Sequence, residues 1–199
     1  MEVSKTQHRH FIIFKPFGCL SQFASNDSKQ QSKIFLGSLH DFPKGIMAIG
    51  RLDEKSEGIL LLTTDGKMSA HINSRKVEKE YYAQVDGDIS TEALWELKTG
   101  VEIGFDGGKY KTKPCKAMKL EGAPDLPNRG KKIRDDRHGP TSWVSITLKE
   151  GKFRQVRKMT SAVGFPTLRL VRVRVGGIHI NNMQAGDVVE VDDFGVSVV

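Results

Sequence analysis

Apolar residues in this chain occur in many short runs separated by glycine, proline and charged residues, which is the pattern of strands joined by turns. In chain order, these runs predict strands at 11–18, 45–50, 58–64, 79–88, 101–103, 110–112, 115–120, 142–151, 167–177 and 186–192. Along 167–177 the apolar phase slips between Leu170 and Val171, and this slip predicts a β-bulge.

Three segments carry helix signals instead. Residues 65–73 follow a turn and suit a short helix, and Ser90 and Gly100 are suited to cap the start and the end of a second helix. A third helix is predicted at 152–163, with a glycine and a proline just beyond it. Because strands outnumber helices and the helices are scattered among hairpin-like runs, the pattern predicts an α+β fold with a mixed, mostly antiparallel central sheet.

The length of 199 residues suits one sizeable domain. Residues 1–10 are polar and predict a flexible tail, whereas 11–199 predict the folded domain, either undivided or as two lobes divided near 76–80. Residues 122–140 combine few apolar residues with many prolines, glycines and charges, and predict a long loop. A loop of that length in a compact domain is usually functional or disordered.

Lys and Arg number 31 against 24 Asp and Glu, which gives a net charge of +7. That excess favours a polyanionic partner, but by itself it fits a merely basic protein equally well. Cys19 and Cys115 form neither a disulfide framework nor a metal motif, so a reduced, cytoplasmic compartment is expected. The histidines show no metal-ligand spacing, and no apolar run approaches the roughly 20 residues of a membrane helix. We therefore expect no metal and no membrane.

The predicted helix at 152–163 is amphipathic with an unusual polar face. At about 100° per residue, its apolar face is predicted to comprise Phe153, Val156, Met159 and Val163. The opposite side carries Arg154 and Lys158, with Arg157 at the border, and no acidic residue. Three more basic residues follow on the next predicted strand: Arg169, Arg172 and Arg174. A contiguous basic surface of this kind favours binding of a nucleic-acid backbone over an ordinary solvated face.

Four segments complete the sequence evidence: "FKPFG", "GRLDEKSEGILLLTTDG", "KEYYAQVDG", and "EGKFRQVRKM" followed by "VGFPTLRLVRVRVGG". In this order they resemble the motifs of the pseudouridine synthases, from about Phe11 to the last strands. The chain is most like the small-family enzymes of ribosomal RNA, in particular the large-subunit synthase E type. Two departures stand out: only a short polar tail precedes the first strand, where many relatives have an S4 domain, and Arg154 stands where many have His.

The resemblance implies the pseudouridine synthase fold around a basic cleft, and isomerisation of one uridine of 23S ribosomal RNA without a cofactor. The bond from ribose C1′ to uracil N1 breaks, the base turns, and C1′ joins C5. The base must leave its stack to be reached. The resemblance assigns the family's catalytic aspartate to Asp53, its basic partner to Arg157 and its active-site tyrosine to Tyr81. Arg51 matches the arginine that fills the gap left by the extruded base.

Physical chemistry agrees with these roles. A guanidinium beside a carboxylate favours its charged form, which can act as a nucleophile or stabilise charge developing at the sugar. RNA binding is assigned to Arg51, Arg154, Lys158, Arg169 and Arg172.

Two other functions remain open at this point. One is a noncatalytic RNA-binding or ribosome-assembly protein on the same fold. The other is a glycoside or nucleoside hydrolase that uses Asp53 and a glutamate, although Glu54 and Glu57 are expected to be surface charges. Lys15 is expected either to support the structure or to touch phosphate, and the protein is expected to be a monomer.

Overall fold

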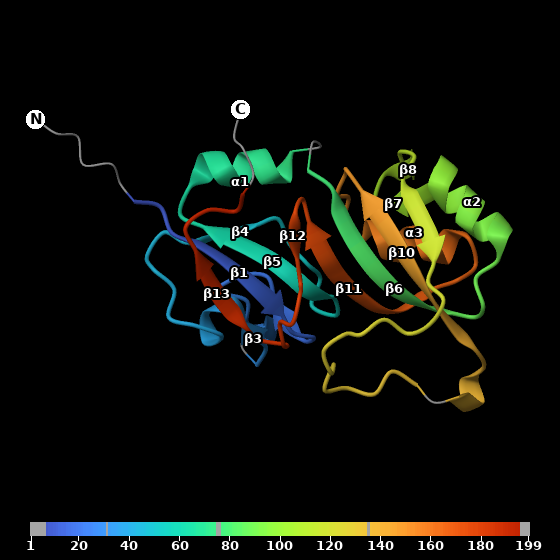
Figure 1. Cartoon of the computed structure of the whole chain (residues 1–199), viewed down its shortest axis with the longest axis horizontal. Coiled ribbons are helices and arrows are strands. Elements are labelled where there is room, and N and C mark those ends of the chain that lie inside the picture. Colours follow the sequence, from blue (N-terminus) through green and yellow to red (C-terminus); the bar gives the residue numbers. More distant parts are fainter. Residues whose placement is uncertain (1–6, 31, 75–76, 135, 196–199) are drawn as a thin grey trace, which may run out of the picture.

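The computed structural model describes residues 7–30, 32–74, 77–134 and 136–195, and shows a twisted mixed sheet running through the molecule (Figure 1). Among the described residues this sheet has nine strands. Seven of them follow one another in the order β13 (Val188–Val191), β1 (His10–Lys15), β5 (Glu57–Thr63), β11 (Thr167–Val175), β6 (Lys79–Asp86), β10 (Thr141–Leu148) and β9 (Lys116–Lys119). All of these pairs are antiparallel except β11 with β5, so the predicted α+β class and mostly antiparallel sheet are confirmed.

Two short strands complete the sheet: β4 (Met47–Ile49) pairs with β5, and β12 (Ile178–His179) pairs with β11. β11 and β4 lie along β5 at different positions. β11 pairs with its first two residues, Glu57 and Gly58, whereas β4 pairs with its last three, Leu61–Thr63. β1 pairs along one side of β5, and β4 and β11 share its other side. The sheet therefore forks where β4 and β11 diverge.

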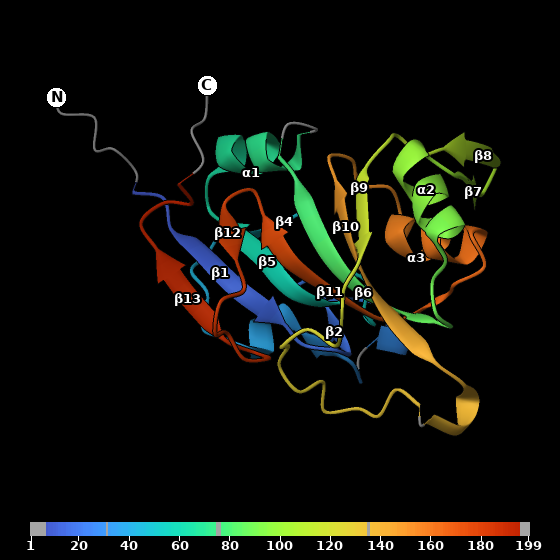
Figure 2. The same ribbon diagram turned by 45° about the vertical axis from the view of Figure 1, so that its right-hand side comes forward.

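The helices lie at the two ends of this sheet. α1 (Gly66–Asn73) lies beside β4, whereas α2 (Thr91–Thr99) and α3 (Gln155–Ala162) lie at the end formed by β6, β10 and β9 (Figure 2). Two small sheets add β2 (Cys19–Leu20) with β3 (Ile34–Phe35) and β7 (Glu102–Phe105) with β8 (Gly108–Lys111). Short 3₁₀ turns occur at Ser28–Gln30, Leu36–Ser38 and Asp136–His138.

The caps predicted for α2 are confirmed. Ser90 Oγ accepts a hydrogen bond from the backbone N–H of Ala93 at 3.2 Å, and Gly100 ends the helix with a φ of 101° that disfavours other residues. α1 begins in the same way, because the Asp65 carboxylate accepts from the N–H groups of Lys67 and Met68.

Separate apolar cores support the two halves of the sheet. One core joins β6 and β10 to α2 and α3 through buried residues such as Val144, Ile146 and Met159. The others surround β1 and β5 with residues such as Phe11 and Leu61. The division near 76–80 stays a prediction: β13, at the end of the chain, pairs with β1, and β11 pairs with both β5 and β6.

The tail prediction is off by one residue at its end. His10 begins β1 and is buried, with its Nδ1 2.9 Å from Thr63 Oγ1 and its ring edge-on to Phe194. Arg9, just before it, forms an ion pair with Glu190 at 2.6 Å. Residues 1–6 of the predicted tail lie outside the described residues.

The predicted bulge between Leu170 and Val171 is wrong in position. Both residues pair regularly with β6, and the register shifts instead between Thr167 and Arg169 and between Arg172 and Arg174. β11 lies inside the sheet with both faces covered, so successive apolar residues are buried there without a local change of register.

The predicted helix at 152–163 also begins later than expected. α3 starts at Gln155, because Arg154 adopts the left-handed conformation with φ 54° and ψ 32°. Val156 and Met159 are buried as predicted, but Phe153 precedes the helix and is 70% exposed, so its assignment to the apolar face is wrong.

Gly58 sets the contact between β5 and β11. Its φ is +105°, and a Cβ built there would lie 2.2 Å from the backbone O of Arg172. We expect Gly58→Ala to lower the free energy of unfolding by at least about 3 kcal/mol, because both the backbone strain and the clash fall on rigid main chain. The measurement is equilibrium urea unfolding.

Gly66→Ala is the matched control. A Cβ built at Gly66 would meet no neighbouring atom within 4 Å, and Gly66 occupies the first turn of α1. It should leave stability unchanged or raise it by up to about 1 kcal/mol. Equal stability of the Gly58→Ala variant and the unchanged protein would contradict the close approach.

Candidate active site

The turn between β4 and β5 carries Asp53. Hydrogen bonds of its main chain fix it to the side chain of Ser21 and close it on itself. Ser21 Oγ donates to the carbonyl of Leu52 at 2.7 Å, and the N–H of Leu52 donates back to the same oxygen at 3.0 Å. The N–H of Ser56 closes the turn on the carbonyl of Asp53 at 3.0 Å. Leu52 is buried, so the turn presents Asp53 from a rigid mount.

Lys15 supports this turn from below. Its ammonium is fully buried and donates to the carbonyls of Cys19 at 2.6 Å, Pro16 at 3.0 Å and Glu54 at 3.4 Å. Burial lowers the pKa of Lys15 to about 8. Of the two roles expected for Lys15, structural support is the one observed, and contact with phosphate is wrong because no ligand reaches a buried ammonium.

Arg157 holds the other side of the turn. Its Nη2 donates to the carbonyl of Lys55 at 2.8 Å and to Ser56 Oγ at 3.3 Å, and its Nη1 donates to the carbonyl of Thr167 at 3.3 Å. Its Nε lies 3.8 Å from Asp53 Oδ2 and is buried without a hydrogen-bond partner. Burial and the nearby Arg154 lower the pKa of Arg157. The predicted pair with Asp53 is therefore an ion pair combined with a clamp on the turn.

Arg154 lies on the more open side of the same carboxylate. Its Nη1 is 3.4 Å from Asp53 Oδ2, and its side chain is 39% exposed. Arg154 was expected only to touch the RNA backbone, and its position beside Asp53 was missed. The position depends on the left-handed backbone at Arg154, which the helical pattern of the segment does not indicate.

Asp53 and Tyr81 line one small cavity of about 70 Å³, together with Arg51, Arg154 and Leu170. Arg157 does not line this cavity and joins the site through its ion pair with Asp53, so the three residues predicted to be catalytic come together from the turn, β6 and α3. A larger cavity of about 310 Å³ adjoins it, and both cavities border on Arg51, Tyr81, Glu150, Gly151 and Lys152.

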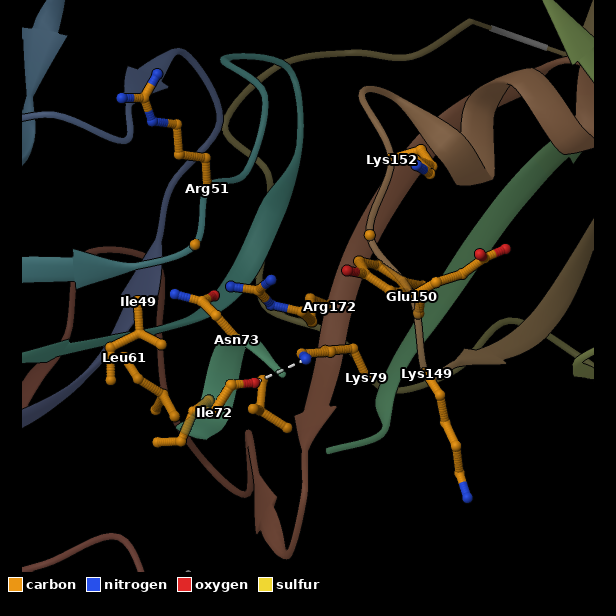
Figure 3. A pocket seen from close by; sticks show the side chains of 14 residues that line it. Ile49, Arg51, Leu61, Ile72, Asn73, Lys79, Lys149, Glu150, Lys152 and Arg172 are labelled. Carbon is orange, nitrogen blue, oxygen red and sulfur yellow. Dashed lines mark hydrogen bonds between the residues drawn. The ribbon is translucent and has the colours of Figure 1, made fainter. Parts of the chain in front are cut away.

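The larger cavity lies in the fork between β4 and β11, over Ile49 and Leu61 (Figure 3). The side chains of Asn73, Lys79 and Arg172 converge on it, whereas Arg51 extends away from this group (Figure 3). Its wall is strongly cationic, because Lys149 and Lys152 border it as well. Such a cavity is suited to an anionic ligand.

Lys79 is half-buried in this wall. It donates to the carbonyl of Ile72 at 2.8 Å, and burial together with the nearby Arg172 lowers the pKa of Lys79 to about 8. Arg172 donates from Nε to the carbonyl of Ile59 at 2.7 Å and is only 5% exposed. Arg172 thus faces the cavity and not an outer surface.

The expected contiguous basic surface over β11 is wrong. Arg169 is buried and makes two hydrogen bonds with the Glu57 carboxylate, at 2.9 and 3.1 Å, so it is not an exposed RNA contact. Arg174 pairs with Glu80 at 2.8 Å and Glu78 at 3.2 Å. These two positions of β11 face other elements of the fold, so their guanidinium groups pair with carboxylates of the protein itself.

Glu57 is correspondingly not a surface charge. It is 1% exposed, and Arg129 from the long loop approaches it at 3.5 Å and lies 4.0 Å above the Phe17 ring. Breaking a buried pair of this kind by removing one partner typically costs about 3–5 kcal/mol. Glu57 therefore ties the loop and β11 to the strand that follows Asp53. Glu54 pairs with Lys33 at 2.5 Å and remains partly exposed.

Glu150 is a second carboxylate at the cavities that sequence reasoning did not single out. It accepts hydrogen bonds from Tyr110 Oη at 2.6 Å, Gln155 Nε2 at 2.6 Å and the N–H of Lys113 at 3.0 Å. Burial opposes its charged form, but these three donors outweigh burial and lower the pKa of Glu150. It is therefore an ionised anchor for the start of α3.

Lys158 is oriented by β7 beside the site. Its Nζ donates to the carbonyl of Gly104 at 2.7 Å and lies 3.7 Å from the centre of the Phe105 ring.

None of the helices in the described ranges is long and apolar enough to cross a bilayer. Within the same residues, no group of three or more His, Cys, Asp or Glu side chains is placed to hold a metal ion.

The arrangement of sheet and helices is that of a pseudouridylate synthase. A crystal structure of such an enzyme superimposes with a TM-score of 0.71 over 92% of this chain and 70% of that one, at 24% identity, which shows the fold alone. The model of the family described as RNA pseudouridylate synthase matches residues 9–162. The chain belongs to this family, whose members are isomerases.

Relatives within the family are similar over most of their length. The chain is 40% identical over 185 residues to the ribosomal large subunit pseudouridine synthase E of Vibrio parahaemolyticus, covering 90% of this chain and 73% of the relative. It is 39% identical over 177 residues to the enzyme of the same name from Xanthomonas campestris, covering 88% and 91%. Synthase B of Bacillus subtilis is 30% identical over 189 residues, covering 94% and 69%.

The buried ammonium of Lys15 predicts a pH dependence of stability. Its pKa is about 8 in the folded chain against an ordinary value of 10.5, so between these values the unfolded chain holds a proton that the folded chain has lost. Raising the pH through that window therefore favours the folded state. The stability of the unchanged protein minus that of Lys15→Met should rise by about 2 kcal/mol from pH 8 to pH 10.

Urea unfolding of both proteins across this range is the measurement. Below pH 7 the difference should stay flat, which provides an internal control. A difference that stays flat throughout, or that falls with pH, would show that the Lys15 ammonium is not desolvated.

Proposed function

We propose that this protein isomerises a specific uridine of large-subunit (23S) ribosomal RNA to pseudouridine, with Asp53 as the catalytic carboxylate. The observation that carries the proposal is the position of Asp53 between Arg154 and Arg157, in one cavity with Tyr81. The two most similar relatives described above are both named for large-subunit ribosomal RNA. The family supplies the reaction, and their names supply the substrate class.

In the proposed reaction, the C1′–N1 bond breaks with its electron pair going to uracil, and C1′ then bonds to C5. The proton that leaves C5 is balanced by the one gained at N1, so the RNA keeps its composition and no outside reactant is required. Asp53 either attacks C1′ or stabilises positive charge on the sugar. The guanidinium groups of Arg154 and Arg157 lie 3.4 and 3.8 Å from the same oxygen of this carboxylate and orient it at the cavity.

Tyr81 borders the cavity from β6, and in the proposed reaction its ring stacks on uracil and its hydroxyl takes part in moving the C5 proton. A cavity of about 70 Å³ at the side of a folded sheet admits a base only after it has left its helix. Arg51 is exposed at the border of both cavities, and in this proposal it occupies the space that the base vacates. The cationic wall around Lys79 and Arg172 then suits the phosphates next to the extruded uridine.

The hydrolase alternative requires a second carboxylate that is free to act on the substrate. Glu57 and Glu150 do not meet this requirement. Glu57 is buried in hydrogen bonds with Arg169, and both oxygens of Glu150 accept hydrogen bonds from protein donors. Because its pKa is lowered, Glu150 is also a poor general acid. A noncatalytic RNA-binding role on the same fold is separated from catalysis by the experiment below.

Replacing Asp53 with Asn should abolish pseudouridine formation, by a factor on the order of a thousand or more, because the amide has no charge and little nucleophilicity. Pseudouridine in large-subunit RNA is mapped by chemical modification and primer extension, in a deletion strain and after complementation. The Glu54→Gln variant of the same turn is the matched control and should restore the modification. Equal rescue by Asp53→Asn would reject catalysis by this carboxylate and leave the noncatalytic role.

Replacing Arg157 with Ala should reduce kcat by about a hundredfold or more while changing KM by less than about threefold, because Arg157 fixes the turn of Asp53 and is 11% exposed in its side chain. Steady-state kinetics on large-subunit RNA provide the measurement. Arg9→Ala, which removes a surface guanidinium paired with Glu190, is the control and should behave as the unchanged protein. A kcat in Arg157→Ala that matches the control would remove Arg157 from the catalytic arrangement.

A further inference from the structure

Phe153 is a large aromatic side chain that the protein leaves in water. Its exposed fraction is 70%, and it lies between Lys152 and Arg154, which both line the cavity of Asp53. Phe153 itself does not line that cavity, so its backbone lies next to the cavity while its ring lies outside it, on the side of Lys158. A single exposed apolar residue has no meaning by itself, and the surroundings of the ring decide its role.

The backbone that presents Phe153 is rigid. The N–H of Lys152 donates to Gln155 Oε1 at 2.9 Å, and the N–H of Gln155 donates to the carbonyl of Lys152 at 3.1 Å. Gln155 is itself 3% exposed and anchored to the buried Glu150 at 2.6 Å. The left-handed Arg154 completes this turn, and such a conformation in a residue other than glycine persists where the surrounding structure imposes it. Phe153 is thus held outward instead of folding into the core.

The charges around Phe153 select the ligand. Lys152, Arg154 and Lys158 flank it, the Lys158 ammonium lies 5.4 Å from the ring centre, and residues 151–163 contain no Asp or Glu. A planar hydrophobic surface among cations is complementary to a ligand that combines flat rings with negative charge. Unpaired nucleotides have this combination, and aromatic side chains that stack on their bases are the usual means of binding single-stranded RNA.

We propose that Phe153 is a stacking platform for an unpaired RNA base, one that neighbours the uridine entering the Asp53 cavity. This proposal rests on the proposed function for the identity of the RNA, but the binding contact itself does not require turnover. Stacking on Phe153 would hold the flanking strand open beside the cavity, while Lys152 and Arg154 neutralise its phosphates. In the free protein the ring of Phe153 is exposed, and in the complex the stacked base would cover it.

The test measures binding of two short single-stranded probes to the full chain: an oligouridylate, and an abasic ribose-phosphate oligomer of the same length and charge. Phe153→Ala should weaken oligouridylate binding on the order of tenfold and leave binding of the abasic oligomer unchanged. Phe153→Tyr should keep the affinity, whereas Phe153→Leu, which retains apolar bulk without a π-face, should lose it. Trp95→Ala, which removes a 64% exposed aromatic residue on α2, is the matched control and should change neither.

Equal losses on the two probes, or full affinity in Phe153→Leu, would overturn the platform. Turnover on large-subunit RNA is followed in the same preparations. A protein that forms no pseudouridine but shows the base-dependent loss keeps the platform and rejects the proposed function. A protein that forms pseudouridine but shows no base-dependent effect of Phe153 keeps the proposed function and rejects the platform.

Discussion

The attachment of the turn that bears Asp53 is the constraint on which the rest of the site depends. Lys15 binds this turn from beneath, Ser21 holds Leu52, and Arg157 grips Lys55 and Ser56 from α3. A carboxylate on a loose turn would approach its guanidinium partners only part of the time, and misplacement by about 1 Å can cost two orders of magnitude in rate. The protein accepts a fully buried ammonium to obtain this stiffness.

The fork of the sheet explains why the cavities lie beside this turn. β11 leaves β5 after two residues, and β4 takes its place further along, so their divergence opens a space between strands that side chains line without filling. Gly58 permits the close approach at the point of divergence. Positive charge is thereby concentrated in a depression instead of being spread over an outer face, and low-dielectric walls strengthen its attraction for an anion.

Local patterns were sufficient for most strands and for the caps of α2, whereas the grouping of Asp53, Tyr81 and Arg157 came from the resemblance to the pseudouridine synthases. Local patterns failed where the outcome depends on partners distant in sequence. Arg169 gives the same local signal whether it faces solvent or Glu57, which is 112 residues away. Phe153 falls in phase with an apolar helix face, and only the left-handed residue after it, itself imposed by tertiary contacts, removes it from that face. The fold was therefore more predictable than the direction of individual side chains.

The clamp between Arg157 and the turn joins residues 102 positions apart, from Lys55 to Arg157. During synthesis, which proceeds from the amino terminus, the acidic turn leaves the ribosome well before α3 and β11 exist to hold it. A nascent chain of this length therefore carries Asp53 without Arg154 and Arg157, the two guanidinium groups beside it in the folded protein. The site can therefore be assembled only after the chain has been synthesised beyond β11.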